Sequence, residues 1–128
     1  MASRADIERW LDAYERAWRE PGTDTLGDLF TPDARYRMSP YEASALGLAE
    51  IGKLWESERQ GPDEAFEMTA SVVAVEGDTG VARVEVRYGT GAEYRDLWVI
   101  SLDPDGRCRE FEEWPFFPGQ EITAEGGA

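Results

Sequence analysis

The stretch VARVEVRYGTGAEYRDLWVISL, residues 81–102, decides the fold because apolar and polar side chains alternate on both sides of one glycine turn. Alternation with a period of two is typical of half-buried β-strands. The turn, Gly89-Thr90-Gly91, offers the backbone freedom that a tight hairpin needs. The stretch therefore predicts two long antiparallel strands, Val81–Tyr88 and Glu93–Leu102, each with one apolar and one charged face.

The same period continues on both sides of this hairpin. Upstream, residues 65–75 alternate and lead into the turn-forming sequence Glu76-Gly77-Asp78-Thr79-Gly80. Downstream, Asp103-Pro104-Asp105-Gly106 has the composition of a type I turn and leads into residues 107–117, which alternate again. A meander of consecutive antiparallel strands is expected.

The first half of the chain has helical spacing instead. Residues 3–20 repeat apolar side chains at steps of three and four, with Ser3 at the position of an N-cap. A short helix over 24–30, a brief strand over 34–38 and a third helix between Gly47 and Gly61 follow. Helices that precede a twisted meander predict an α+β fold in which a strongly curved, mostly antiparallel sheet wraps around the helices.

Length and composition are those of an ordinary folded domain. The chain has 128 residues, of which 41% are hydrophobic and 12% aromatic. This is enough for one core and too little for two ordinary domains. We therefore expect a single domain over residues 1–119, followed by a Gly-, Ala- and Glu-rich tail, residues 120–128, that frays.

Charge restricts the expected partners. Thirteen basic and twenty-seven acidic residues give a net charge of −14, which repels nucleic-acid backbones and anionic membrane surfaces. No apolar run is long enough for a membrane span or a signal sequence. The single cysteine, Cys108, cannot form an intramolecular disulfide. A cytoplasmic protein that binds neither nucleic acid nor membrane is expected.

The sequence contains no histidine. This removes Ser-His and Cys-His catalysis and His-ligated zinc from the possible mechanisms. Any acid-base chemistry is left to aspartate, glutamate, tyrosine, lysine and arginine.

The chain carries, in this order, the strings Trp10-Leu11-x-x-Tyr14-x-x-Ala17-Trp18, Leu29-Phe30-Thr31-Pro32-Asp33-Ala34-x-Tyr36, Ser39-Pro40-Tyr41, Gly47-x-x-x-Ile51, Leu97-Trp98-Val99-Ile100 and Glu113-Trp114-Pro115. Together they resemble the nuclear transport factor 2-like superfamily, in particular its SnoaL-like branch. The resemblance implies a cone-shaped fold with a deep apolar pocket between sheet and helices, and frequent homodimers through the outer face of the sheet. The superfamily includes ketosteroid isomerases, polyketide cyclases, limonene epoxide hydrolases, dehydratases and proteins without known activity, so fold alone does not determine function.

Strand pairing brings two carboxylates to the apolar face. Symmetric turns would place Val86 opposite Asp96, and Asp96 opposite Glu113, so that both acids lie side by side under aromatic side chains. A one-residue bulge in the last strand would instead turn Glu112 and Trp114 inward. Two neighbouring carboxylates in an apolar site cannot both ionise cheaply, so the pair is expected to hold a shared proton. Alone they offer a hard cation too few oxygens, so no metal and no other cofactor is expected.

A tyrosine completes the predicted catalytic group. Tyr14, on the apolar face of the first helix, could stabilise an oxyanion while Asp96 or Glu113 moves the proton. Alternatively, Tyr14 is a core tyrosine and the two acids are a structural hydrogen-bonded pair. The residues predicted to line the ligand pocket are Trp10, Trp18, Tyr36, Met38, Tyr41, Trp55, Val86, Tyr88, Trp98 and Phe111.

Two patterns of the superfamily are missing. The isomerases carry their basic aspartate near the first strand, where this chain has Tyr36, Met38 and Ser39. The Asp-Arg-Asp arrangement of the epoxide hydrolases is also absent, because Arg95 is adjacent to Asp96 and therefore points to the opposite face.

Two classes of function stay open. The first is a small enzyme of the isomerase, cyclase or hydratase type, which uses carboxylate acid-base chemistry on a hydrophobic small molecule. The second is non-catalytic, either a module that binds a hydrophobic ligand or a dimeric structural protein.

Overall fold

The computed structural model describes residues 1–59 and 65–120. Its elements follow in the order α1 (Arg4–Arg19), α2 (Leu26–Leu29), β1 (Phe30–Arg37), β2 (Ala45–Leu46), α3 (Gly47–Glu58), β3 (Phe66–Glu76), β4 (Thr79–Tyr88), β5 (Glu93–Leu102) and β6 (Cys108–Phe116). The predicted α+β class is confirmed. The sequence does not predict β2, because two residues are too short for a periodic pattern. Gly61 and, except for Gln120, the tail predicted to fray lie outside the described residues.

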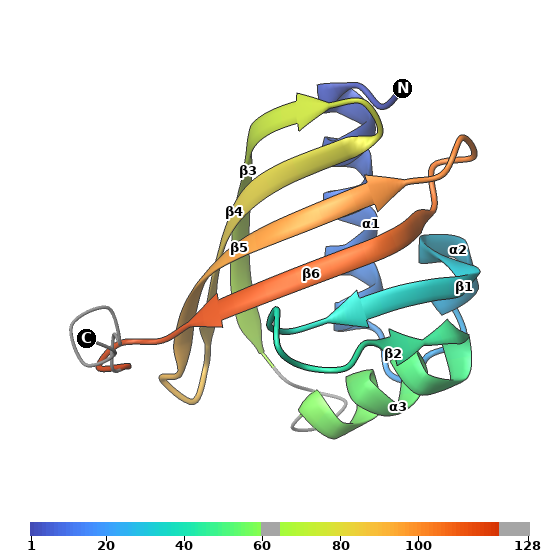
Figure 1. The fold of residues 1–128 in the computed structure, drawn as a ribbon. Helices are drawn as coiled ribbons and strands as arrows, with labels where there is room; N and C mark the ends of the chain where they lie inside the picture. The colour runs from blue at the N-terminus through green and yellow to red at the C-terminus, as the bar shows by residue number, and fades with distance from the viewer. Residues whose placement is uncertain (60–64, 121–128) are drawn as a thin grey trace.

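The described strands form one sheet in the order β2-β1-β6-β5-β4-β3. β1 runs parallel to β6, and the other neighbouring pairs are antiparallel. Figure 1 shows the long strands β3 to β6 curving around α1, while α3 lies next to β1 and β2. The predicted strongly curved, mostly antiparallel sheet is therefore confirmed.

Helix α1 begins with a capping box and turns one face to the sheet. The Ser3 hydroxyl accepts a hydrogen bond from the Asp6 N–H at 3.1 Å, and the Asp6 carboxylate accepts one from the Ser3 N–H at 2.8 Å. The predicted N-cap is confirmed. The buried residues of the helix are Ile7, Trp10, Leu11, Tyr14 and Ala17. Within the described residues, no helix is long and apolar enough to cross a membrane.

Near its N-terminus, α1 approaches β4 very closely. A Cβ atom placed on Gly80 would lie only 2.6 Å from Cγ1 of Ile7. A side chain at position 80 would therefore push the helix away from the sheet.

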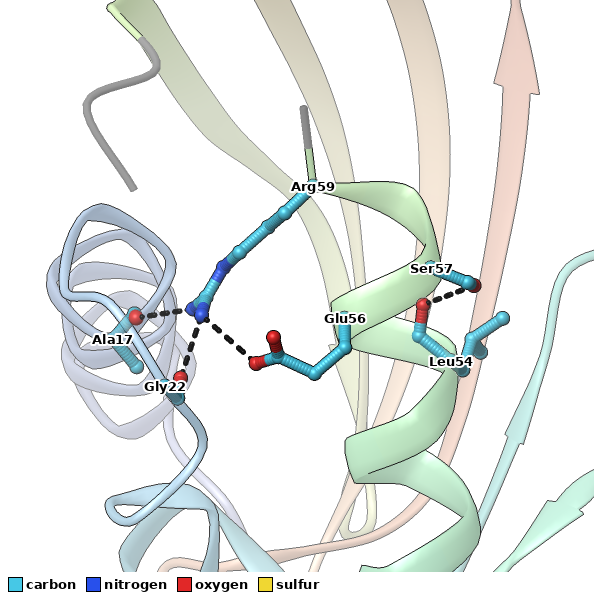
Figure 2. Close-up of polar contacts among 6 residues, drawn as sticks. All are labelled: Ala17, Gly22, Leu54, Glu56, Ser57 and Arg59. Atoms are coloured by element: carbon cyan, nitrogen blue, oxygen red, sulfur yellow. Dashed lines mark hydrogen bonds and ion pairs between the residues drawn. The ribbon is translucent and has the colours of Figure 1, made fainter. Parts of the chain in front are cut away.

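Arg59, directly after α3, connects this helix to α1 (Figure 2). Its guanidinium donates to the carbonyls of Gly22 at 2.6 Å and Ala17 at 3.0 Å, and lies 3.4 Å from the Glu56 carboxylate. Only 7% of the Arg59 side chain is exposed. Because Ala17 belongs to the last turn of α1, the cation also offsets the negative end of that helix. The ends of the two helices are thus held together.

Strand partners on the inner face differ from the sequence-based pairing by two residues. Val84, not Val86, lies opposite Asp96 in β4. Pro115, not Glu113, lies opposite Asp96 in β6. The predicted direct pairing of the two acids is therefore wrong, and they are diagonal neighbours instead.

Two local features cause these differences. The β4–β5 turn is centred on Thr90 and closed by a 2.8 Å hydrogen bond from the Tyr88 N–H to the Ala92 carbonyl. In the β5–β6 pair, the partner of Leu102 is Cys108, one residue later in β6 than predicted. An irregularity next to this pair then shifts the remaining partners by one more residue. Because each final difference is two residues, every side chain keeps the face that the period of two assigns to it.

Candidate functional site

A cavity of about 140 Å³ lies between the inner face of the sheet and the helices α1 and α3. Its floor and walls come from α1, α3, β1, β3, β4, β5 and β6, so the curvature of the sheet is what encloses it. Ten of the residues predicted for the site line this cavity: Tyr14, Trp18, Tyr36, Met38, Trp55, Val86, Tyr88, Asp96, Trp98 and Glu113.

Three predicted pocket residues lie elsewhere. Trp10 and Phe111 are buried in the core, 3% and 1% exposed, with their ring centroids 5.3 Å apart. The Trp10 indole N–H donates to the Leu29 carbonyl at 2.9 Å. Tyr41, in the segment between β1 and β2, is fully exposed. The sequence indicated an inward side chain from helical spacing at Trp10, strand alternation at Phe111 and a family string at Tyr41, but not which cavity, if any, each would reach.

Seven further lining residues were not predicted, namely Leu54, Glu58, Phe66, Met68, Ala92, Tyr94 and Pro115. Most were detectable in principle. Tyr94 and Pro115 stand two residues from Asp96 and Glu113 and so share their face of the sheet. Glu58 follows Trp55 by one helical turn and brings a third carboxylate to the cavity.

Three oxygens from distant parts of the chain meet at Glu113. The Tyr14 hydroxyl lies 3.4 Å and the Tyr36 hydroxyl 3.3 Å from Oε1 of Glu113, and the two hydroxyls are 3.2 Å apart. The three side chains come from α1, β1 and β6. The arrangement offers a ligand oxygen several hydrogen-bond donors at one point of the cavity wall.

The pKa of Glu113 is raised from its usual 4.5 to about 8. Burial is the main cause, and the negative charge of Asp96 is the second. The hydroxyls of Tyr36 and Tyr14 act in the opposite direction. The raised pKa favours the protonated, neutral carboxyl of Glu113 near neutral pH.

Asp96 differs from Glu113 in its contacts and in the size of its pKa shift. Its Oδ2 accepts a 3.0 Å hydrogen bond from the Trp98 indole N–H, while its Oδ1 has no partner among the described residues. Burial raises the pKa of Asp96 to about 6, and the bonds from the Trp98 indole and the Phe116 backbone limit the rise. The pKa of Glu113 is therefore raised more than that of Asp96, so Glu113 is the acid of the pair that keeps its proton to higher pH.

The tyrosines of the cavity stay protonated. Burial raises the pKa of Tyr14 and Tyr36 well above the usual value, and the charge of Glu113 adds to this effect. Both hydroxyls therefore act as hydrogen-bond donors over the whole physiological range. One cavity thus combines two carboxyls, whose pKa values are raised to different extents, with two hydroxyl donors.

Metal ligands are not assembled here. Within residues 1–59 and 65–120, no group of three or more acidic or cysteine side chains is placed to hold a metal ion. Cys108 is fully buried, its thiol contacts the Glu110 carbonyl at 3.1 Å, and burial raises its pKa to about 12. A thiol in this state is a poor nucleophile.

The structure is similar to those of several solved proteins. A proposed isomerase of the SnoaL-like family from Agrobacterium tumefaciens shares 18% identity over 88% of this chain and 98% of that chain, with a TM-score of 0.69. SalBIII, an epoxide hydrolase/cyclase-like enzyme in pyran ring formation in the polyether salinomycin, shares 14% identity over 91% and 95% of the two chains, with a TM-score of 0.73. A computationally designed 17-OHP binder shares 11% identity over 82% and 89%, with a TM-score of 0.64. At these identities, the likeness shows a common fold.

The family assignment comes from the sequence itself. A search of curated proteins found no match. The family model described as the SnoaL-like domain, in contrast, matches residues 7–111, which include Tyr14, Tyr36 and Asp96 and end shortly before Glu113. This match covers most of the chain and agrees with helices enclosed by a curved sheet. The chain belongs to the SnoaL-like domain family.

Proposed function

We propose that the protein is a small enzyme that moves a proton within a compact, hydrophobic, carbonyl- or hydroxyl-bearing molecule. The observation that carries this proposal is the division of roles in one cavity. Asp96 presents an oxygen without a partner among the described residues, and the Glu113 carboxyl meets the hydroxyls of Tyr14 and Tyr36. A base and an acid with different pKa values in one site are the usual arrangement for proton transfer at neutral pH.

For a ketone with a neighbouring double bond, the steps are as follows. Asp96 removes a proton from the carbon next to the carbonyl, and the electron pair of that C–H bond moves toward the carbonyl oxygen. Glu113, Tyr14 and Tyr36 hydrogen-bond to the oxygen as its negative charge develops. Asp96 then returns the proton to a different carbon. The product is an isomer of the substrate, and no other reactant is consumed.

The comparisons support a small-molecule enzyme of this general kind. The solved relatives include proteins described as a proposed isomerase and as a cyclase-like enzyme. The chemistry proposed here for this chain rests on its own residues, because the matched region ends before Glu113.

The test uses a probe that the cavity can hold. Conversion of 3-cyclohexenone, a single-ring ketone, to its conjugated isomer is followed by ultraviolet absorbance. Wild-type protein should accelerate it, and Asp96→Asn and Glu113→Gln should each lower kcat by about 10²-fold or more. Glu112→Gln, on the opposite face of β6, is the matched control and should keep the wild-type rate. Wild-type activity in Asp96→Asn, or no acceleration by wild type, would contradict the proposal.

A second candidate is ligand binding without turnover. Both carboxyls already have hydrogen-bond partners, Trp98 for Asp96 and the two tyrosines for Glu113, which a purely structural pair also needs. The designed 17-OHP binder demonstrates that a related fold can serve binding. Tryptophan fluorescence that responds to the ketone without isomerisation would favour this candidate.

A further inference from the structure

The cavity has the electrostatic character of a cation site. The three ionisable side chains other than tyrosine that line it are all acidic: Glu58, Asp96 and Glu113. No lysine or arginine is among the described lining residues. The chain as a whole carries a net charge of −14, so its field attracts cations and repels anions at the entrance.

The wall between these acids is aromatic. Eight of the lining residues are Phe, Tyr or Trp, contributed by two helices and four strands. Aromatic faces attract organic cations, and a ring of such faces is a common way to recognise ammonium groups. Tyr14 and Trp98, with ring centroids 4.6 Å apart, lie beside the two acids of the β5–β6 pair.

The arginines near the cavity already have interaction partners outside it. Figure 2 shows Arg59 reaching from the end of α3 to the end of α1, where it contacts Ala17, Gly22 and Glu56. Arg19, in the same way, pairs with Glu15 at 2.8 Å and donates to a backbone carbonyl. Neither arginine neutralises the carboxyls of the cavity.

These arginines also indicate where a bound cation would lie. The Arg59 guanidinium stands 5.1 Å from the ring of Trp18 and 5.4 Å from that of Trp55, and Arg19 stands 4.0 Å over Phe66. A second cation on those rings would be repelled. The remaining aromatic surface with carboxyls beside it is on the side of Asp96 and Glu113.

We propose that the natural ligand is a compact organic cation, a protonated amine of about one ring in size, whose ammonium group lies between Asp96 and Glu113. The Oδ1 of Asp96, which has no partner among the described residues, is its expected acceptor, and Asp96 is only 9% exposed. The volume of about 140 Å³ is close to that of a cavity that holds benzene, roughly 150 Å³. The inference uses the cavity of the proposed function but is independent of the proposed reaction, because an ammonium group there would occupy Asp96 and ionise Glu113.

Binding of a cation has a consequence for protons. The groups that face Glu113 are Asp96 from β5, Tyr14 from α1, Tyr36 from β1 and Glu58 from α3, none of which is a cation. An ammonium group would supply the missing positive charge and lower the pKa of Glu113 below its present value of about 8. At about pH 7, binding should therefore release protons.

The test compares three probes of one size and different charge: benzylamine, benzyl alcohol and benzoate. Isothermal titration calorimetry at about pH 7 should give a Kd for benzylamine about tenfold below that for benzyl alcohol, with benzoate the weakest. Titrations in buffers of different ionisation enthalpy should show proton release with benzylamine. Asp96→Asn should remove most of the preference, and Glu113→Gln should remove the proton release. Glu112→Gln should change neither, and near-ultraviolet circular dichroism checks that each variant is folded.

The outcomes separate this inference from the proposed function. Preference for benzylamine without isomerisation of 3-cyclohexenone would support the cation site and contradict the proposed reaction. Isomerisation together with equal or tighter binding of benzyl alcohol or benzoate would overturn the cation site alone. The cation site is also overturned if none of the three probes binds to folded wild-type protein at millimolar concentration.

Discussion

Replacing Glu113 by glutamine should stabilise the protein at alkaline pH and change it little in acid. Burial, with the charge of Asp96 second, raises the pKa of Glu113 from 4.5 to about 8. Between these two values, the folded protein keeps a proton that the unfolded chain has lost. The stability that this proton contributes is complete below about pH 4.5 and is lost as the pH rises through about 8.

The size of the loss follows from the pKa interval. Each pH unit between the unfolded and folded pKa is worth about 1.4 kcal/mol, so the interval from 4.5 to about 8 sets an upper limit of about 5 kcal/mol. Because Glu113 is partly exposed through the cavity, we expect about 2–3 kcal/mol. Glutamine has nearly the same volume, can still accept bonds from Tyr14 and Tyr36, and carries no charge to bury. Because glutamine does not titrate, the free energy of unfolding of Glu113→Gln should not show the loss that ionisation of Glu113 causes in the wild type.

Urea unfolding followed by tryptophan fluorescence at about pH 5, 6.5 and 8 measures both proteins. Glu112→Gln is the control, since it removes one negative charge from the outer face, where Glu112 lies 3.9 Å from Arg37. Asp96 titrates in all three proteins, so the difference between wild type and Glu113→Gln isolates Glu113. Parallel loss of stability in wild type and Glu113→Gln between pH 5 and 8 would refute the reasoning, as would an equal gain in Glu112→Gln.

Three further predictions concern residues outside the cavity. Gly80→Ala should lower the free energy of unfolding by about 1–3 kcal/mol, because its Cβ would lie 2.6 Å from Ile7; thermal unfolding measures this, and no change would mean that α1 can move aside. Arg59→Ala should lower stability by about 2 kcal/mol or more, since it frees two carbonyls and uncovers two tryptophan rings. The exposed Arg16→Ala is its control, and equal effects of the two changes would argue against the contacts of Arg59. Cys108 should react with a thiol reagent only on unfolding, because it is buried and its pKa is raised to about 12; rapid labelling of the folded protein would contradict its burial.

The face of each site residue could be predicted, but its strand partner could not. Asp96 points inward because the period of two in β5 puts it on the buried apolar face. For β6 the same period favoured Glu113, with a one-residue bulge that turns Glu112 inward as the alternative. Their pairing depends on how many residues each turn uses. The extra shift between Ser101 and Leu102 has no sequence signal, since bulges form wherever local packing favours them.

Contacts between distant elements could not be predicted from the periodicity of the sequence. Helical spacing placed Tyr14 on an apolar face, and alternation suggested the same for Tyr36, but neither indicates that both hydroxyls reach Glu113. That meeting depends on the curvature of the whole sheet. The exposure of Tyr41 illustrates the same limit, because a short string shared with a family does not determine the path of a loop.

One arrangement underlies the proposed chemistry, the pH dependence and the cation site. A carboxyl stays protonated near neutral pH only where no nearby cation compensates its charge, and the described lining of this cavity offers Glu113 hydroxyls, aromatic rings and a second acid. The same lining makes the ionised form costly and attracts a ligand cation. The two experiments on Glu113 must therefore agree. If wild type and Glu113→Gln lose stability in parallel, Glu113 is already ionised, and benzylamine can then release no proton from it. Proton release in that case would have to come from Asp96 and would disappear in Asp96→Asn.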